Sequence, residues 1–522
     1  MSLKKVSFLF LFSLFFSGKN ILHAQLKISD EALFTKCHLM FIKSVVPKTS
    51  SLGQNLLDKI KNKQITGSEA CILLIKQVDF FVNGKKTSEL NLPLPALTDA
   101  EQKQIISTFH NFHNSWFTQK SFKFGNDSNL ILRDNDEPSL YFTKALFANN
   151  VDLSSVFTSQ ETLRGFRETS FESKSARWKD KPFDAHFQNV YGSDLGFLLS
   201  YGVDESVFTL PIPDAQLVPF GRLKGTENVP SFIVPEVYVY KPQNVSLEFK
   251  NKINDELDLK KKNINLFENF GGGILGSQVF IMKNTNLSLY QLSGGIENSI
   301  ESVMPRRISS RVFENLLCQQ IPTLMPDDVS NDIIPDSKLM FRRSVSCMQC
   351  HSSLDTFASV YRNLVPYLTS TNIFSNDVSL QKKGTSINGL TAFTPSKNLN
   401  EPVPIQQPSG YLNYRDHQNN LIKKNVNNIH EMGLLLAESP DFYRCVAKRY
   451  YQFLTGYNVE LSQKIYSFND TNLAKVHREK VYQIAEHLKK HQSLVKMIDE
   501  IINSPAFSTR ANNIETEKRE IK

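Results

Sequence analysis

Cysteine, histidine and tryptophan are scarce in this sequence. The 522 residues include six cysteines, eleven histidines and two tryptophans. Any close grouping of cysteine with histidine is therefore informative, because chance brings such rare residues together infrequently. The remaining composition is that of an ordinary globular protein, and the length predicts two to four domains with a large core.

The sequence also has no long apolar run, except at its N-terminus. Lys4 and Lys5 precede an apolar stretch at 6–16, and Ala24 offers a cleavage site. The stretch is too short to span a bilayer comfortably, so we expect a secretory signal at 1–24 and no transmembrane span in the mature chain. An uncleaved anchor is the alternative. We expect a periplasmic or otherwise exported protein.

The chain has only a small excess of positive charge. The formal net charge is +8, and removal of residues 1–24 takes away three lysines and no acid, which leaves +5. The chain contains no dense run of lysine and arginine interleaved with aromatic residues. This pattern argues against nucleic acid as a partner.

The most informative motif in the sequence combines two cysteines with a histidine. Cys347, Cys350 and His351 form a C-x-x-C-H sequence, the pattern for covalent attachment of a c-type haem. Two thiols three residues apart on one helical turn can both add to the vinyl groups of a single porphyrin, and the adjacent imidazole can then reach the iron from the same side. The motif predicts one covalent haem c, with His351 as an axial ligand.

Other uses of a C-x-x-C pair fit less well. In the cytosol, such a pair indicates a redox-active dithiol or half of a zinc site. The sequence has no second C-x-x-C to complete a zinc site. Export favours the haem interpretation, because covalent haem attachment takes place outside the cytoplasm.

Hydrophobic periodicity predicts a mainly α protein with short β hairpins and several modules, in which a cytochrome c-like haem-attachment segment is flanked by helical modules. The predicted parts are a signal peptide (1–24), an N-terminal helical module (25–115), a mixed α/β middle module (116–300), a haem-attachment module (301–425), a C-terminal helical module (426–507) and a disordered tail (508–522).

Local signals refine this outline. Asp99 is a candidate helix cap. The stretch 231–240 is extended, and Pro235 within it predicts an edge strand or a bend. The proline- and aspartate-rich stretch 321–336 is typical of a linker. Ser439 and the proline that follows it predict the start of a long helix.

Two further motifs have simpler explanations. Gly271, Gly273 and Gly276 match the dinucleotide fingerprint G-x-G-x-x-G, but no buried parallel strand precedes them. We expect a glycine-rich entry into a tightly packed helix there. His110 and His113 share a helix face, but no nearby carboxylate or cysteine completes a metal site, so we expect surface or partly buried histidines.

Several segments resemble a large, poorly characterised family of exported bacterial cytochrome c-like proteins. The matching stretches are 315–322, 347–355, 410–416, 438–456 and 502–507. The resemblance is best over about 271–507, and the chain departs from it at Thr356, where the family usually has proline. It implies export and a haem-attachment motif between two helical modules of unknown function, and it supplies no substrate.

The sixth iron ligand decides much of the chemistry, because a His/Met iron suits electron transfer and an open site suits O₂ or peroxide chemistry. The first methionine after the motif is Met432, far along the chain and in a helical pattern. His417, in a predicted hairpin turn, is the other candidate. Simple packing of Met432 and simple exposure of His417 are the alternatives.

The other four cysteines are candidates for disulfide bonds. Cys37 and Cys71 lie in the same small helical module, which favours their pairing and leaves Cys318 with Cys445. Buried free thiols are the alternative, since each cysteine lies among apolar residues.

Three functions follow as hypotheses. The first is an exported electron carrier with a single covalent haem and an unspecified redox partner. The second is a haem enzyme, such as a peroxidase or oxidase, with an open distal site. The third is a structural or binding protein, in which the haem or a Cys347–Cys350 disulfide has only a structural role.

Overall fold

The computed structural model of the chain is mainly helical with small sheets, as the sequence predicts. It describes residues 27–82, 84–87, 93–117, 136–167, 233–240, 271–284, 296–320, 324–337, 339–361, 364–370, 386–392, 409–462 and 471–509. The predicted signal peptide and the tail after residue 509 lie outside these ranges. Within them, no helix combines the length and apolarity needed to cross a membrane.

The first part of the chain forms a series of helices. These helices are α2 Asp30–Ile42, α3 Ser51–Lys61, α4 Gly67–Lys76, α5 Asp99–Ser115, α6 Glu137–Phe147 and α7 Ser155–Thr158. Side chains cap the N-termini of α2 to α5. Helix α5 begins with a capping box in which Thr98 accepts a hydrogen bond from the backbone of Glu101. The predicted cap Asp99 is therefore wrong by one residue, because the threonine hydroxyl satisfies the free backbone N–H and Asp99 is the first helical residue.

A four-stranded sheet lies beside these helices. Its strands are β1 Phe81–Val82, β2 Lys85–Lys86, β3 Thr162–Arg167 and β4 Ile233–Tyr240, in the order β2-β1-β4-β3. Strand β4 runs parallel to β1 and antiparallel to β3, so of the two predicted alternatives, an edge strand or a bend, the edge strand is wrong. The register of β3 shifts between Gly165 and Arg167, opposite the stretch that contains Pro235, and this irregularity accommodates a residue without a backbone N–H.

The glycine-rich segment is a packing device. It forms the 3₁₀ helix η6 Gly273–Gly276, followed by α11 Gln278–Lys283. A Cβ atom on Gly273 would lie 2.0 Å from the Val156 carbonyl oxygen, and one on Gly272 would lie 2.6 Å from the Ile429 carbonyl oxygen. Only glycine permits these backbone approaches, and the expected tightly packed entry into a helix is confirmed.

The remaining elements follow in chain order. They are α13 Ile296–Leu316, α14 Pro326–Val329, η7 Ser330–Asp332, η8 Met340–Arg343, α15 Val345–Ala358, η9 Ser359–Tyr361, β5 Leu364–Ser370, β6 Ser386–Ala392, β7 Gly410–Arg415, β8 Leu421–Val426, α17 Ile429–Glu438, α18 Pro440–Thr455, α19 Asn472–His491, α20 Leu494–Ile502 and α21 Pro505–Ser508. The predicted linker at 321–336 thus contains α14 and η7. Strands β5 and β6 form one antiparallel hairpin, and β7 and β8 form another.

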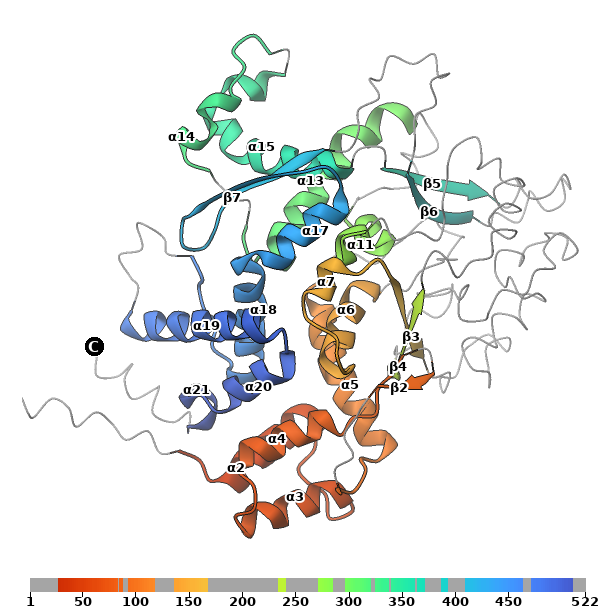
Figure 1. The fold of residues 1–522 in the computed structure, drawn as a ribbon, viewed down its shortest axis with the longest axis vertical. Helices are drawn as coiled ribbons and strands as arrows, with labels where there is room; N and C mark the ends of the chain where they lie inside the picture. The colour runs from red at the N-terminus through yellow and green to blue at the C-terminus, as the bar shows by residue number, and fades with distance from the viewer. Residues whose placement is uncertain are drawn as a thin grey trace, which may run out of the picture.

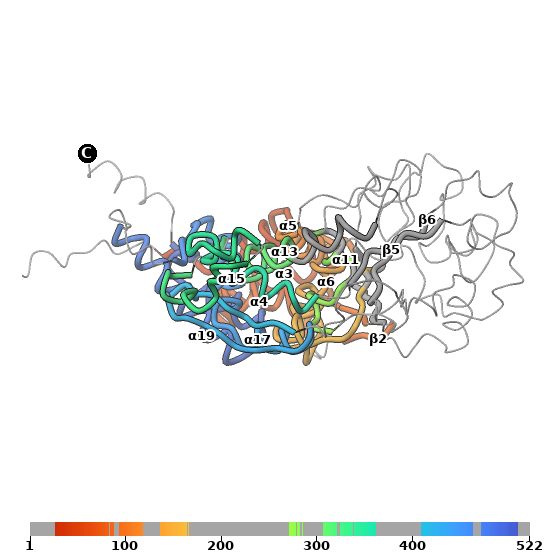
Figure 2. Tube along the Cα trace, turned by 90° about the horizontal axis from the view of Figure 1, so that it is seen from above, coloured from red at the N-terminus to blue at the C-terminus, as the bar shows by residue number. Residues whose placement is uncertain are grey.

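One hydrophobic core joins the two ends of the chain. It runs from Leu33 in α2 to Phe507 in α21. The Phe112 and Phe453 rings, both partly buried, pack against this core and stack on each other with centroids 4.2 Å apart. A backbone hydrogen bond from Ile28 to Ser508 ties the first described residues to the last. Figure 1 shows the helices α18 to α21 between the N-terminal helices and the segment that carries α14 and α15, and Figure 2 shows the same body from above.

Both predicted disulfide pairings are present. Cys37 in α2 is bonded to Cys71 in α4, and Cys318 is bonded to Cys445 in α18. The first bond closes a separation of 34 residues within the N-terminal helices, and the second closes one of 127 residues across the chain. Each bond restricts the unfolded chain and stabilises the fold.

We expect the double variant Cys318→Ala/Cys445→Ala to lose about 2–4 kcal/mol of unfolding free energy, measured by urea denaturation without reductant. Reductant should lower the stability of the wild type. It should lower the stability of the variant less, because the variant has only the Cys37–Cys71 bond to lose. The pairing would be contradicted if non-reducing peptide mapping of the unfolded wild type found these cysteines open to alkylation.

Candidate functional site

The C-x-x-C-H motif lies on α15, at the end of the molecule remote from α2 to α4 (Figure 1). Cys347 is exposed and Cys350 is half-buried, and both are free thiols. Their i, i+3 spacing places them on neighbouring turns of one helix face. The structure thus leaves these two cysteines unpaired, in contrast to the other four, and presents them together at the surface.

The opposite face of α15 is packed. Met348 lies against Leu324 and Val329 in a small hydrophobic cluster separate from the main core. The Gln349 side chain donates to the Leu324 carbonyl oxygen at 2.7 Å, and the Leu324 amide donates to the Gln349 carbonyl oxygen at 3.0 Å. This packing fixes the rotation of the helix and keeps Cys347 turned outward.

The His351 imidazole is oriented by a carboxylate. Its Nδ1 atom lies 3.2 Å from Oδ2 of Asp355, one helical turn further on. An ionised carboxylate can only accept a hydrogen bond, so Nδ1 is the donor of this pair, and the tautomer with its proton on Nδ1 has its lone pair on Nε2. The ring stacks on Phe341 with centroids 4.2 Å apart, and its side chain is 27% exposed.

The same carboxylate is held by an arginine from another helix. Arg306 of α13 donates from Nη2 to Oδ2 of Asp355 at 2.9 Å and from Nε to Oδ1. Its guanidinium carbon lies 5.0 Å from the centroid of the Phe341 ring. Asp355 thus contacts both His351 and Arg306, and Phe341 contacts the same two side chains. The four residues form a closed cycle of contacts beside the helix.

Apolar side chains are exposed around the motif. Of the ten large hydrophobic residues that are exposed among the described residues, four lie between positions 334 and 345. They are Ile334, Leu339, Met340 and Val345, and Met340 is the most exposed of all ten at 77%. These four exposed apolar side chains in one short stretch are a candidate surface for an apolar partner or ligand.

Comparisons with known proteins add no assignment to this geometry. The chain matches no family model, no curated protein and no solved structure. The resemblance described above therefore remains an expectation, and the function is inferred from the residues of this chain.

The donor set around α15 fits a covalent haem c. Among the described residues, no group of three or more histidine, cysteine or acidic side chains could hold a metal ion directly. A haem would need only one such side chain for its iron, because the porphyrin nitrogens would also bind the metal. Cys347 and Cys350 would bond to the porphyrin and Nε2 of His351 would reach the iron, and the group would supply one-electron redox chemistry.

The β7–β8 hairpin packs directly against α15. A Cβ atom on Gly410 would lie 2.1 Å from the Thr356 carbonyl oxygen, so the strand meets the helix backbone directly. At the other end of β7, Arg415 donates to both carboxylate oxygens of Asp328, at 2.7 and 2.8 Å. The hairpin thus contacts both α15 and α14, and it sets the position of the motif relative to the core.

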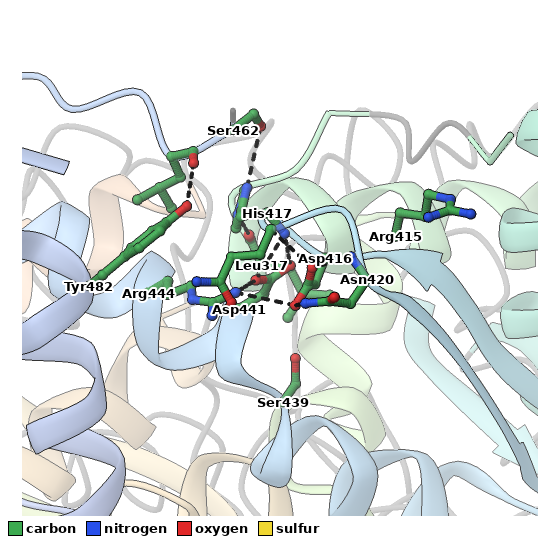
Figure 3. Close-up of polar contacts among 12 residues, drawn as sticks. Leu317, Arg415, Asp416, His417, Asn420, Ser439, Asp441, Arg444, Ser462 and Tyr482 are labelled. Carbon is green, nitrogen blue, oxygen red and sulfur yellow. Dashed lines mark hydrogen bonds and ion pairs between the residues drawn. The ribbon is translucent and has the colours of Figure 1, made fainter. Parts of the chain in front are cut away.

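The turn of this hairpin is anchored in a buried cluster of charges (Figure 3). Arg444 of α18 is almost fully buried and contacts Asp441 at 2.9 Å and Asp416 at 3.4 Å. Asp441 also accepts from the His417 amide at 3.1 Å and from Gln319 at 2.7 Å. Burial raises the pKa of Asp441, and His417 and Arg444 oppose this rise by favouring the charged carboxylate.

The two candidates for a sixth iron ligand lie in other surroundings. Both ring nitrogens of His417 are engaged, Nε2 with the Leu317 carbonyl oxygen at 2.9 Å and Nδ1 with Ser462 at 3.3 Å. Met432 is fully buried in α17 and belongs to the main core. His351 is instead half-exposed beside the separate cluster around Met348. Ligation of the iron by His417 would break one of the hydrogen bonds of its ring. Ligation by Met432 would take the Met432 side chain out of the main core.

His110 and His113 are buried in a polar network within the core. His113 contacts the Thr143 hydroxyl at 3.0 Å and the Tyr450 hydroxyl at 2.6 Å. Burial, and then the proximity of His110, lower the pKa of His113 well below its usual value. The expectation of surface or partly buried positions is wrong for these two residues, because hydroxyl partners satisfy both ring nitrogens of His113 without solvent.

Asp328 makes the stability of this region depend on pH. The hydrogen bonds from Arg415 lower the pKa of Asp328 below its usual 3.8. Its contribution is therefore fully present above pH 3.8 and is lost as the pH falls through the lowered pKa. We expect the difference in unfolding free energy between wild type and Asp328→Asn to be largest above pH 3.8 and to close in stronger acid.

Urea denaturation at several acid pH values measures this difference. The matched control is Asp327→Asn, which changes the exposed neighbour and leaves the Arg415 contact intact. The control should follow the wild type across the series. A constant gap between wild type and Asp328→Asn at every pH would contradict the assignment.

Proposed function

We propose that the protein is an exported, c-type haem-binding protein that transfers electrons through a single covalent haem. Cys347 and Cys350 bind the porphyrin, and His351 is an axial ligand of the iron. The observation that carries the proposal is the pairing of His351 Nδ1 with Asp355, which leaves Nε2 with its lone pair beside two free thiols. Iron-ligating histidines characteristically give their other ring N–H to a carboxylate or carbonyl group.

Export is supported by the cysteines. Two disulfide bonds are typical of a protein that folds in an oxidising compartment. The apolar stretch at the N-terminus has the order of a secretory signal, and covalent haem attachment requires the same compartment. The proposal therefore places the mature chain in the periplasm or an equivalent exported location.

Electron transfer is favoured over enzyme catalysis by the exposure of the motif. Cys347 is exposed, and the apolar side chains around the motif reach solvent. A haem attached there would have an edge near the surface, where a redox partner can approach. An oxidase or peroxidase instead needs a distal pocket with controlled polarity and access.

Covalent attachment is directly testable. Produced in an exporting host with a cytochrome maturation system, the wild type should retain haem stain after denaturation. The double variant Cys347→Ala/Cys350→Ala should lose the stain completely, because no thioether bonds can form. The matched control is Ser346→Ala on the same helix, which should stain like the wild type. A wild type that matures without haem, while a control cytochrome in the same cells acquires it, would contradict the proposal.

Met432 and His417 would each have to leave their present contacts to ligate the iron, so we expect neither to do so, and an electron-transfer haem would take its sixth ligand from another residue. We expect Met432→Ala to lose about 2–5 kcal/mol of stability, as for other large-to-small core changes. His417→Ala should also destabilise the fold through its lost hydrogen bonds. In folded samples of both variants, the reduced absorption spectrum and CO binding should equal those of the wild type. A lowered reduction potential and new CO binding in Met432→Ala would identify Met432 as the ligand.

A further inference from the structure

Asp355 is shared between two groups with opposite effects on a bound iron. One of its oxygens, Oδ2, accepts from His351 Nδ1 at 3.2 Å and from Arg306 Nη2 at 2.9 Å. The second oxygen, Oδ1, accepts from Arg306 Nε. The side chain of Asp355 is 21% exposed, so these contacts are only partly screened by water.

Each partner changes the electron density on the imidazole in a definite direction. A carboxylate at Nδ1 makes a histidine a stronger base and a better donor to ferric iron, which lowers the reduction potential. A guanidinium bound to that carboxylate withdraws part of its negative charge, which raises the reduction potential. The two side chains thus act in opposition through one hydrogen bond.

Resting on the proposed function, we propose that Asp355 and Arg306 are positioning residues that set the reduction potential of the haem in opposite directions. Asp355 lowers the potential through His351, and Arg306 raises it through Asp355. Phe341 holds both partners in place, because its ring lies against the imidazole and the guanidinium. The alternative is that the Arg306–Asp355 pair merely fastens α13 to α15.

Two other arginines near this site, Arg343 and Arg311, have partners of their own. Arg343 donates from Nε to the Ser337 carbonyl oxygen at 2.6 Å, away from the imidazole. Arg311, one turn and a half beyond Arg306 on α13, pairs with Glu314. Among the described residues, the cation that contacts Asp355 is therefore Arg306.

The test is spectroelectrochemical titration of the purified full-length holoprotein. Asp355→Asn should raise the reduction potential, and Arg306→Gln should lower it. We expect each change to alter the ferric-to-ferrous ratio at fixed potential by about tenfold, which is about 59 mV for one electron. Arg306→Lys, which keeps the charge, should lie between the wild type and Arg306→Gln. Arg311→Gln removes the same charge from the same helix without touching Asp355 and should leave the potential unchanged.

The outcomes separate this inference from the proposed function. A merely structural pair would make Asp355→Asn and Arg306→Gln shift the potential in the same direction, since both loosen α15, and this result would overturn the inference while the haem assignment stands. Equal potentials in all variants would also overturn it. Haem content is measured before each titration, and a wild type without haem would overturn the proposed function itself.

Discussion

The buried guanidinium of Arg444 holds together the part of the fold on which the motif depends. It compensates two carboxylates, Asp416 in the hairpin turn and Asp441 at the start of α18. Without it, both acids would be buried without a counter-charge, which costs several kcal/mol. The Cys318–Cys445 bond joins α13 to α18 immediately beside this cluster. The end of α13, the hairpin and α18 are thereby fixed as one unit.

This arrangement explains how a surface motif can be positioned with precision. Helix α15 packs on the small cluster around Met348 and reaches the main core only near its end, through Phe357, and it takes its orientation from α13 and β7. Arg306 fixes it from α13, and the close contact at Gly410 fixes it from β7. The helix therefore combines an exposed face, suited to attaching a large group, with an imidazole that is held by its neighbours.

Much of this organisation could be predicted from sequence, because the signals are local. Periodicity predicted the mainly helical fold, and Ser439 with the proline that follows it predicted the start of α18. The spacing of His351 and Asp355 also indicates an i, i+4 contact on a helix. The partnership of Asp355 with Arg306 could not be found in this way, because 49 residues separate them.

The errors have the same physical origin. The position of β4 inside its sheet depends on pairing with β1 and β3, both of which lie more than sixty residues earlier in the chain, and no local pattern records such pairing. Likewise, the burial of His113 depends on Thr143 and Tyr450. Contacts between segments far apart in the sequence determine the position of β4 and the burial of His113, and local propensity does not predict such contacts.

The central claim is that α15 carries one haem bonded to its own two thiols. Mass spectrometry of proteolytic peptides from the exported protein tests this most directly. The account predicts that the peptide containing Cys347 and Cys350 has the added mass of one haem and that neither thiol can be alkylated. An unmodified peptide with two alkylatable thiols, or with a Cys347–Cys350 disulfide, from cells that mature other c-type cytochromes would contradict it.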